Sequence, residues 1–311
     1  MKVLISSRSF GKINSGAIQL LMDNGFDLVL NPYGKKLSEK EILGLMDDDI
    51  VGIIAGTELI TKKIIEKSIN LQVISRYGVG LDNVDLKEVG KKDILVYNTP
   101  DAPALAVAEL ALSLMLNLLK KIGIGDRRLR KKKWKGEVGN LLTKKTVGII
   151  GLGKIGKKVV EFLEPFQVQI LATEPYPDKQ FISEKKIKLV SFDDLISSSD
   201  IISLHVPLNN ETKHIIGENE LSKMKQNSIL VNTSRGGLIK EDDLYNALKE
   251  RRIAGAGVDV FEREPDTNRL ETLENIVVTP HIGTLTIETR RQMEIEAAEN
   301  LINGLKKVKV L

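Results

Sequence analysis

The sequence predicts an α/β protein with two doubly wound parallel-sheet domains, of the Rossmann and flavodoxin-like kind, and a cleft between them. Three observations support this prediction. Short apolar runs alternate with helical patterns along the chain, as in parallel sheets flanked by helices. The length of 311 residues exceeds that of one typical domain core. A glycine-rich motif, GLGKIG at residues 151–156, lies between an apolar run and a helical pattern.

The first part of the chain contains five apolar runs that we expect to be strands. Helical patterns lie between some of them, at residues 38–46 and 61–67. The expected strands are 2–6, 27–30, 51–55, 73–75 and 95–97. Together they predict a first sheet domain over residues 1–98.

A second set of apolar runs follows a long apolar stretch at 102–119. Because that stretch contains Glu109, Ser113 and Asn117, we expect a buried helix and not a membrane span.

The segment 286–305 is expected to form one long helix that returns to the first domain. The predicted domains are therefore 1–98 plus 283–311, the substrate domain, and 99–282, the dinucleotide domain. The strands expected in the latter begin at 146 and continue at 168–172, 188–190, 201–204, 228–232, 255–260 and 276–279.

Composition excludes several classes of function. The chain has no cysteine, so disulfides, zinc–thiolate sites and cysteine nucleophiles are excluded, and no metal site is expected. Its 46 basic and 42 acidic residues give a net charge of +4, which argues against nucleic-acid or membrane partners. The N-terminal apolar run is too short for a signal peptide, so a cytoplasmic location is expected.

The glycine-rich motif has the context of a dinucleotide site. Gly151 would permit a tight turn, Gly153 would let a pyrophosphate approach the backbone, and Gly156 would let helix pack on strand. The helix N-terminus would then offer free N–H groups to phosphate. Glu174 ends the next apolar run, eighteen residues after Gly156, where it could bind a ribose diol and repel a 2′-phosphate. The alternative is an ordinary glycine-rich turn between a strand and a helix.

Three further motifs each follow an expected strand of the second domain, at residues 232–237, 257–265 and 279–283. Because ligands bind beyond the carboxyl ends of parallel strands, we expect Arg235, Glu264 and His281 to converge. Reduction of a 2-oxoacid requires a proton donor with a pKa near neutrality, which suits His281. Glu264 would orient it, and the guanidinium of Arg235 would bind a carboxylate. Taken singly, each could instead be a loop histidine, a solvated carboxylate or a surface arginine.

The order of these motifs resembles the D-isomer-specific 2-hydroxyacid dehydrogenase family over nearly the whole chain. The resemblance also includes RYGVGLDN at 76–83, NTP at 98–100, VAE at 107–109 and HVPL at 205–208. It is greatest to the phosphoglycerate dehydrogenase-like branch, without the C-terminal regulatory domain that some of those enzymes carry.

This resemblance implies an NAD-dependent oxidoreductase that uses Arg235, Glu264 and His281 in catalysis. It places the substrate carboxylate at backbone N–H groups around Val79 and Gly80, and Asp259 at the carboxamide end of NAD. The residues assigned to substrate binding are Arg76, Tyr77, Val79, Gly80 and Arg235. Those assigned to NAD binding are Gly151, Gly153, Lys154, Ile155, Gly156, Glu174, His205, Val206, Pro207, Thr212, Thr233, Ser234, Arg235, Asp259, His281 and Gly283.

The substrate stays open between alternatives. One candidate is 3-phosphoglycerate, but the segment Gly56-Thr57-Glu58 lacks an arginine that some phosphoglycerate dehydrogenases offer to phosphate. The first alternative is a glyoxylate or hydroxypyruvate reductase. The second is a non-catalytic, NAD-sensing regulator with the same fold.

The apolar residues of 104–119 cover more than one helical face, which predicts a homodimer. The basic run 127–135, with seven cations and Trp134, follows this stretch. It is interpreted as a solvated helix face, as an interface arm that reaches a substrate phosphate, or, least favoured, as a nucleic-acid contact.

Overall fold

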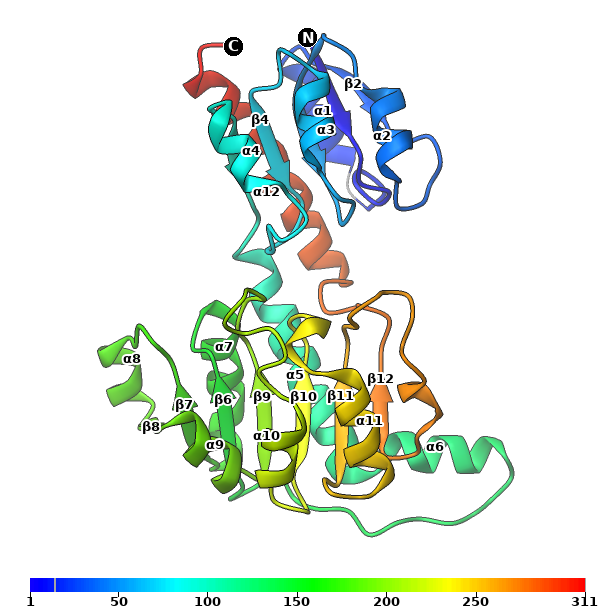
Figure 1. The fold of residues 1–311 in the computed structure, drawn as a ribbon, viewed down its shortest axis with the longest axis vertical. Coiled ribbons are helices and arrows are strands. Elements are labelled where there is room, and N and C mark those ends of the chain that lie inside the picture. Colours follow the sequence, from blue (N-terminus) through cyan, green and yellow to red (C-terminus); the bar gives the residue numbers. More distant parts are fainter. Residues whose placement is uncertain (14, 311) are drawn as a thin grey trace. The chain divides into compact units, whose positions relative to one another are not determined.

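The structure is a computed structural model that describes residues 1–13 and 15–310, and it divides into two compact units. Unit 1 comprises residues 1–103 and 285–311, and unit 2 comprises residues 104–284. Both units are built on parallel sheets with helices on either face, as the sequence predicts, and Figure 1 shows both.

Unit 1 contains a five-stranded sheet in the order β2-β1-β3-β4-β5, and every neighbouring pair is parallel. This is the flavodoxin-like order, in which the connections reverse direction between the first and third strands. All five strands expected in this part of the chain are confirmed. They are β1 (Lys2–Ile5), β2 (Asp27–Leu30), β3 (Ile50–Ala55), β4 (Val73–Arg76) and β5 (Leu95–Tyr97).

Alternate residues of the unit 1 strands enter two separate cores. Val3 and Ile5 lie in one core with α1 and α12, whereas Leu4 lies in the other with α2, α3 and α4. Helix α12 packs on β3, β4 and β5, which confirms that the C-terminal helix returns to the first domain (Figure 1). The helices are α1 (Ser15–Asp23), α2 (Glu39–Leu45), α3 (Lys62–Lys67), α4 (Leu86–Lys91) and α12 (Ile287–Lys307).

Unit 2 contains a seven-stranded parallel sheet in the order β12-β11-β10-β9-β6-β7-β8, with the reversal between β6 and β9. This is the strand order of a Rossmann fold with one added strand. The strands are β6 (Thr146–Ile150), β7 (Gln169–Thr173), β8 (Lys188–Leu189), β9 (Ile201–Leu204), β10 (Ile229–Asn232), β11 (Gly255–Val258) and β12 (Ile276–Val278).

Both faces of the unit 2 sheet are covered. Ile149 enters a core with α5 and α7, and the next residue, Ile150, enters a core with α9, α10 and α11. The helices are α5 (Ala102–Lys120), α6 (Ile122–Arg130), α7 (Lys154–Leu163), α8 (Lys179–Glu184), α9 (Phe192–Ser198), α10 (Glu218–Lys223) and α11 (Glu241–Lys249). Three short 3-10 helices are η1 (Glu164–Phe166), η2 (Gly236–Leu238) and η3 (Leu270–Thr272).

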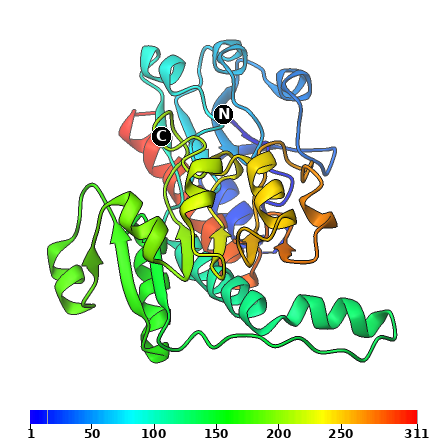
Figure 2. The same ribbon diagram turned by 60° about the horizontal axis from the view of Figure 1, so that its bottom comes forward.

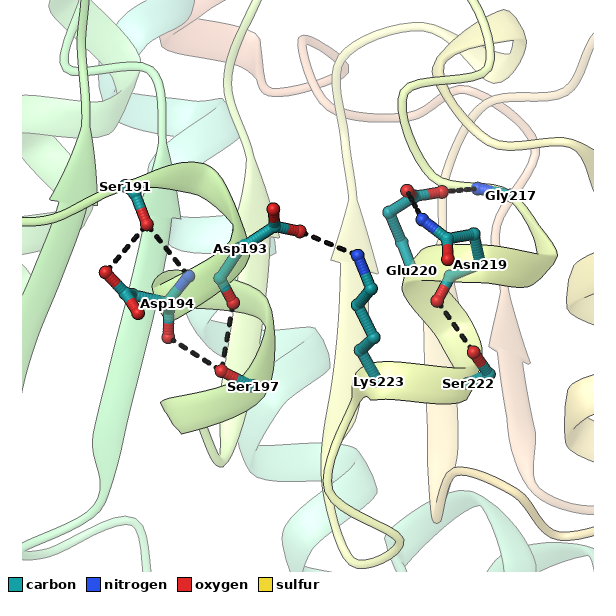
Figure 3. Close-up of polar contacts among 9 residues, drawn as sticks. All are labelled: Ser191, Asp193, Asp194, Ser197, Gly217, Asn219, Glu220, Ser222 and Lys223. Carbon is teal, nitrogen blue, oxygen red and sulfur yellow. Dashed lines mark hydrogen bonds and ion pairs between the residues drawn. The ribbon is translucent and has the colours of Figure 1, made fainter.

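Polar contacts join α9 and α10 on their solvent side. Lys223 of α10 forms an ion pair of 2.8 Å with Asp193 of α9, and Ser191 caps α9 by accepting from the backbone of Asp194 (Figure 3). Glu220 accepts from the backbone N of Gly217 at the start of α10. All these groups are near the surface, so we assign them to local structure and not to a ligand site.

Helix α5 is long and apolar enough to cross a membrane by length and composition alone. Of its most apolar window, 56% is buried inside the structure. Ala108, Ala111, Leu114 and Met115 pack against the sheet of unit 2, so α5 serves as a core helix.

Helix α6 and the segment after it extend from the sheet of unit 2 (Figures 1 and 2). The sequence favours a solvated helix face for the basic run 127–135. Helix α6 ends at Arg130, however, so the second part of this run lies outside the helix. We call residues 131–141 the arm. It exposes three large apolar side chains, Trp134, Val138 and Leu141.

Candidate active site

The glycine-rich turn connects β6 to α7. Gly151 has φ +95°, in the region that favours glycine, and a Cβ on Gly156 would lie 2.1 Å from the carbonyl oxygen of Gly151. Beside Gly153, in contrast, no atom lies within 4 Å of an added Cβ. Within the described residues, the backbone N–H groups of Gly153 and Ile155 have no acceptor. The first turn of α7, which also contains Lys154, therefore offers an open, electropositive site of the size and chemistry that a pyrophosphate requires.

Glu174 lies directly after β7 and faces this turn. Its carboxylate accepts hydrogen bonds from the backbone N of Leu152 at 2.8 Å and of Tyr176 at 3.0 Å. The carboxylate is thus held at the end of β7, next to the glycine-rich turn. Its remaining lone pairs suit a ribose diol.

The turn after β9 lies beside the glycine-rich turn, because the strand order of the unit 2 sheet reverses between β6 and β9. The carbonyl oxygen of His205 lies 2.7 Å from the position of a Cβ on Gly151. The imidazole itself is buried, with its Nε2 2.9 Å from Ser203 Oγ, and burial lowers its pKa to about 4. The main chain of His205 therefore borders the glycine-rich turn, while its imidazole is buried beside Ser203.

After His205, the chain makes a turn that contains Val206 and Pro207. The hydroxyl of Thr212 closes this turn by donating to the carbonyl oxygen of Pro207 at 2.6 Å. Val206 also borders the glycine-rich turn, because its side chain lies 2.8 Å from a Cβ placed on Gly151.

The turn after β10 presents Thr233, Ser234 and Arg235. Asn232 fixes it, since its side chain accepts from the N of Ser234 and donates to the carbonyl oxygen of Arg235. The hydroxyl of Ser234 donates to Leu204 O at 2.8 Å, which ties β10 to β9. Arg235 is half-buried and Thr233 is buried, with no hydrogen-bond partner for its hydroxyl among the described residues.

His281 and Glu264 form an ion pair after β12 and β11. Nδ1 of His281 lies 2.9 Å and 3.0 Å from the two carboxylate oxygens of Glu264. Each side chain is 39% exposed, so the pair is open to solvent and to a ligand. Because Glu264 engages Nδ1, the second ring nitrogen is left for proton transfer.

The other two predicted catalytic residues, His281 and Arg235, both affect the pKa of Glu264. Burial raises the pKa of Glu264, but the hydrogen bond and charge of His281 outweigh burial, and the charge of Arg235 acts in the same direction. The pKa of Glu264 therefore lies below its ordinary value. Glu264 is therefore an anion at neutral pH that accepts a hydrogen bond from Nδ1 of His281.

Asp259 holds the loop that carries His281. Its carboxylate accepts from Thr279 Oγ1 at 2.6 Å, from Ile282 N at 2.8 Å and from Gly283 N at 2.9 Å. Burial raises the pKa of Asp259, and these hydrogen bonds partly oppose that effect. The structure thus gives Asp259 a positioning role that sequence reasoning missed, together with its partner Thr279. The sequence could have indicated this role, because Thr279 and Gly283 lie on either side of Pro280 and His281.

The predicted substrate residues of unit 1 begin at Arg76, the last residue of β4. Arg76 and Tyr77 are buried, and Arg76 donates from Nε to Asn83 at 3.3 Å and from Nη1 to the carbonyl oxygen of Tyr77. Val79 and Gly80 come next, and the side chain of Asn98 donates to Val79 O. No acceptor in residues 1–13 and 15–310 pairs with the backbone N–H of Val79 or Gly80. Two adjacent free donors can bind a carboxylate.

In the part of the chain that the structure describes, no cluster of three or more His, Cys, Asp or Glu side chains could hold a metal ion.

Comparison with known proteins bears on this arrangement. Residues 112–283 match the model of the family described as D-isomer specific 2-hydroxyacid dehydrogenase, NAD binding domain. The hydroxypyruvate reductase of Thermotoga maritima is 38% identical over 299 residues, which cover 94% of this chain and 96% of that protein. The D-3-phosphoglycerate dehydrogenase of Methanocaldococcus jannaschii is 41% identical over 270 residues, or 85% of this chain. The chain spans about half the length of that relative, 51%.

Among solved structures, the D-lactate dehydrogenase of Aquifex aeolicus, complexed with NAD and lactic acid, has a TM-score of 0.86. It is 27% identical, and the match covers 100% of this chain and 96% of that one.

Proposed function

Because the chain belongs to the D-isomer-specific 2-hydroxyacid dehydrogenase family and unit 2 is its NAD-binding domain, we propose that it interconverts a 2-oxoacid and a D-2-hydroxyacid. The observation that carries this proposal is the His281–Glu264 ion pair, in the same unit as the dinucleotide turn. A regulator that only senses NAD would not require a histidine oriented by a carboxylate.

His281 is the proposed acid in reduction and base in oxidation. Glu264 holds Nδ1, so the proton that reaches the substrate oxygen leaves from Nε2. The hydrogen bond between Nδ1 and Glu264 orients the ring so that Nε2 can face the substrate oxygen, which is what an acid catalyst requires. Asp259 keeps the loop in place through the N–H groups of Ile282 and Gly283.

Two groups of donors are proposed for the substrate carboxylate. Arg235 in unit 2 supplies a guanidinium, which fits a planar anion with two parallel hydrogen bonds. In unit 1, the free N–H groups of Val79 and Gly80 supply the second group. Arg235 also polarises the carbonyl carbon for reduction.

The residues around the glycine-rich turn fit NAD. The open space beside Gly153 and the N–H groups at the start of α7 would hold the pyrophosphate, and Glu174 the adenosine ribose. When bound, NADH supplies the hydride that C2 of the 2-oxoacid receives. Because Glu174 is an acid, a ribose 2′-phosphate would be repelled, and we expect NAD rather than NADP as the cofactor.

Two substrate groups are considered. A phosphorylated 2-oxoacid is supported by the similarity to the phosphoglycerate dehydrogenase. A short 2-oxoacid without a phosphate, such as glyoxylate or hydroxypyruvate, is supported by the similarity to the hydroxypyruvate reductase, whose length the chain nearly matches.

The proposal includes a cytoplasmic homodimer. The support from α5 is smaller than the sequence predicts, because most of its apolar residues pack inside unit 2 and, of its large apolar side chains, just Leu105 is exposed. The arm offers better support, since Trp134 is 92% exposed and Val138 95%. A second copy of the chain is the commonest way to cover such residues. Light scattering at micromolar concentration should return twice the 34.5 kDa chain mass, and a 34.5 kDa particle would rule out the dimer.

The reaction is tested by measuring NADH oxidation with pyruvate, glyoxylate, hydroxypyruvate and 3-phosphohydroxypyruvate. We expect reduction of at least one 2-oxoacid, and the values of kcat/KM rank the candidates. If NADH binds but no member of the panel is reduced, the regulator is the better account.

A further inference from the structure

Helix α11 begins with a buried acid that the proposed reaction does not use. Glu241, the first residue of the helix, is 6% exposed. Its carboxylate accepts a hydrogen bond from the backbone N of Glu262 at 2.7 Å, and the carboxylate of Glu262 accepts from the backbone N of Glu241 at 3.4 Å. Leu244 and Leu248 anchor α11 in the core of unit 2. The helix is therefore a fixed support for the segment 259–264, which follows β11.

Hydrogen bonds connect this contact to the proposed proton donor. Glu241 binds the N–H group of the peptide that joins Phe261 to Glu262. The backbone N of Phe261 donates to Oε1 of Glu264 at 3.3 Å. The same carboxylate lies 2.9 Å and 3.0 Å from Nδ1 of His281. A displacement of the peptide would therefore move the carboxylate that orients the imidazole.

The turn that carries Arg235 packs against the same peptide. A Cβ on Gly236, the residue after Arg235, would overlap the carbonyl carbon of Phe261 and the backbone N of Glu262. Because both of these are backbone atoms, they cannot move aside as the end of a flexible side chain could. The peptide between Phe261 and Glu262 thus contacts both the Arg235 turn and the start of α11.

Stabilisation of the helix alone does not explain why Glu241 is buried. An acid in the first turn of a helix interacts favourably with the helix dipole, but Asp242 and Asp243 occupy the same turn, and Asp242 is exposed. Burial raises the pKa of Glu241, and the hydrogen bond from Glu262 acts in the opposite direction. The contact does not require the charge, since a carboxyl oxygen accepts a hydrogen bond in either protonation state.

We propose that Glu241 is a positioning residue that holds the carboxylate of Glu264 where it can orient the imidazole of His281. It does so by fixing the peptide between Phe261 and Glu262. This inference rests on the proposed function and deepens it. A misplacement of about 1 Å can lower the rate of a positioned reaction by about a hundredfold, so a residue that does not react can still control kcat.

The test measures kcat, KM and NADH affinity with the 2-oxoacid that the wild type reduces fastest. Glu241→Ala removes the acceptor and should lower kcat by about tenfold to a hundredfold, with KM and NADH affinity little changed. Glu241→Gln keeps an oxygen that can accept from Glu262 and should retain most of kcat. Asp242→Ala is the matched control, because it removes an exposed acid from the same helical turn and should leave kcat unchanged.

A double-mutant cycle tests whether Glu241 acts through Glu264. If it does, Glu241→Ala should have little further effect on kcat in a Glu264→Gln background. Two losses that multiply would show that Glu241 acts independently of Glu264, which contradicts the inference.

A wild-type kcat in Glu241→Ala overturns the inference. An equal loss in Asp242→Ala also overturns it, because that result assigns the effect to the helix, and so does a loss in Glu241→Gln as large as in Glu241→Ala. Thermal unfolding identifies a variant that does not fold. If Glu241→Ala is unfolded, Glu241→Asp decides, because it keeps an acid in the helical turn but shortens the side chain by a methylene. Its kcat should fall, and a wild-type value overturns the inference.

A wild type that binds NADH but reduces no 2-oxoacid contradicts the proposed function itself, and the inference fails with it. An active wild type whose kcat does not depend on Glu241 contradicts the inference alone.

Discussion

Two regions of unit 2 place a histidine beyond the carboxyl end of a strand, yet their surroundings differ. His205, after β9, is buried beside Ser203, and its pKa falls to about 4. His281, after β12, is open to solvent and paired with Glu264. The sequence suggests a possible role at the cofactor for both. The comparison teaches that position after a strand does not by itself make a histidine a candidate proton donor: the proposed donor is the one that an acid orients and that a ligand can reach.

The largest expected effect separates the two histidines in catalysis. His281→Gln should lower kcat by roughly 10²–10⁴, the usual contribution of a positioned acid, because glutamine cannot donate the proton. Affinity for NADH should change little, since the imidazole is not at the glycine-rich turn. Steady-state rates and NADH fluorescence titration check both statements. A near-normal kcat between pH 6 and 9 would remove His281 from the mechanism.

His205 should instead affect stability and its dependence on pH. The folded pKa of about 4 lies below the ordinary value of 6.5, so the unfolded chain binds a proton first as the pH falls from 6.5 toward 4. The free energy of unfolding of unit 2 should therefore decrease over this range, by about 3 kcal/mol from this group. In His205→Asn, this contribution should be absent. Denaturant unfolding of both proteins at pH 7 and pH 4.5 measures it, and equal changes in the two would contradict the burial argument.

The guanidinium of Arg235 should be needed for its shape as well as its charge. Arg235→Lys keeps the charge but loses the paired hydrogen bonds, which should lower kcat/KM by about tenfold to a hundredfold, the value of a charged hydrogen bond. Both kcat and substrate affinity should fall. If NADH binding alone is weakened, Arg235 does not bind the substrate carboxylate.

Cofactor choice should show the smallest effect. Because we propose that Glu174 binds the adenosine ribose, where a 2′-phosphate would meet its charge, NADH should be preferred over NADPH by about fivefold or more, for a like-charge pair at a partly wet site. Comparison of kcat/KM for the two cofactors measures this. Glu174→Gln should reduce the preference, and equal values in the wild type would contradict the assignment.

Local patterns were sufficient to predict much of unit 2. The GLGKIG motif specifies its own turn, because the positive φ of Gly151 and the crowding at Gly156 both require glycine. The pairing of Glu264 with His281 could be inferred since both residues follow strands of one parallel sheet. The expected strands and the long C-terminal helix followed from the spacing of apolar residues.

Features that depend on distant residues could not be predicted in this way. Ser6 and Glu58 meet across 52 residues, and no local pattern records that contact. The sequence does not record that the imidazole of His205 is buried beside Ser203, nor that most apolar residues of α5 pack in the core of unit 2. Helix α1 was not expected, although its apolar residues Ala17 and Leu21 are buried in unit 1.

The central claim, that the imidazole of His281 donates the proton, is tested most directly by chemical rescue. His281→Ala removes the ring and opens space beside Glu264, so imidazole added in solution should restore NADH oxidation by a 2-oxoacid in proportion to its concentration. The wild type and His205→Asn should not respond. A His281→Ala protein that binds NADH normally but shows no dependence on imidazole, or a response in His205→Asn, would contradict the account.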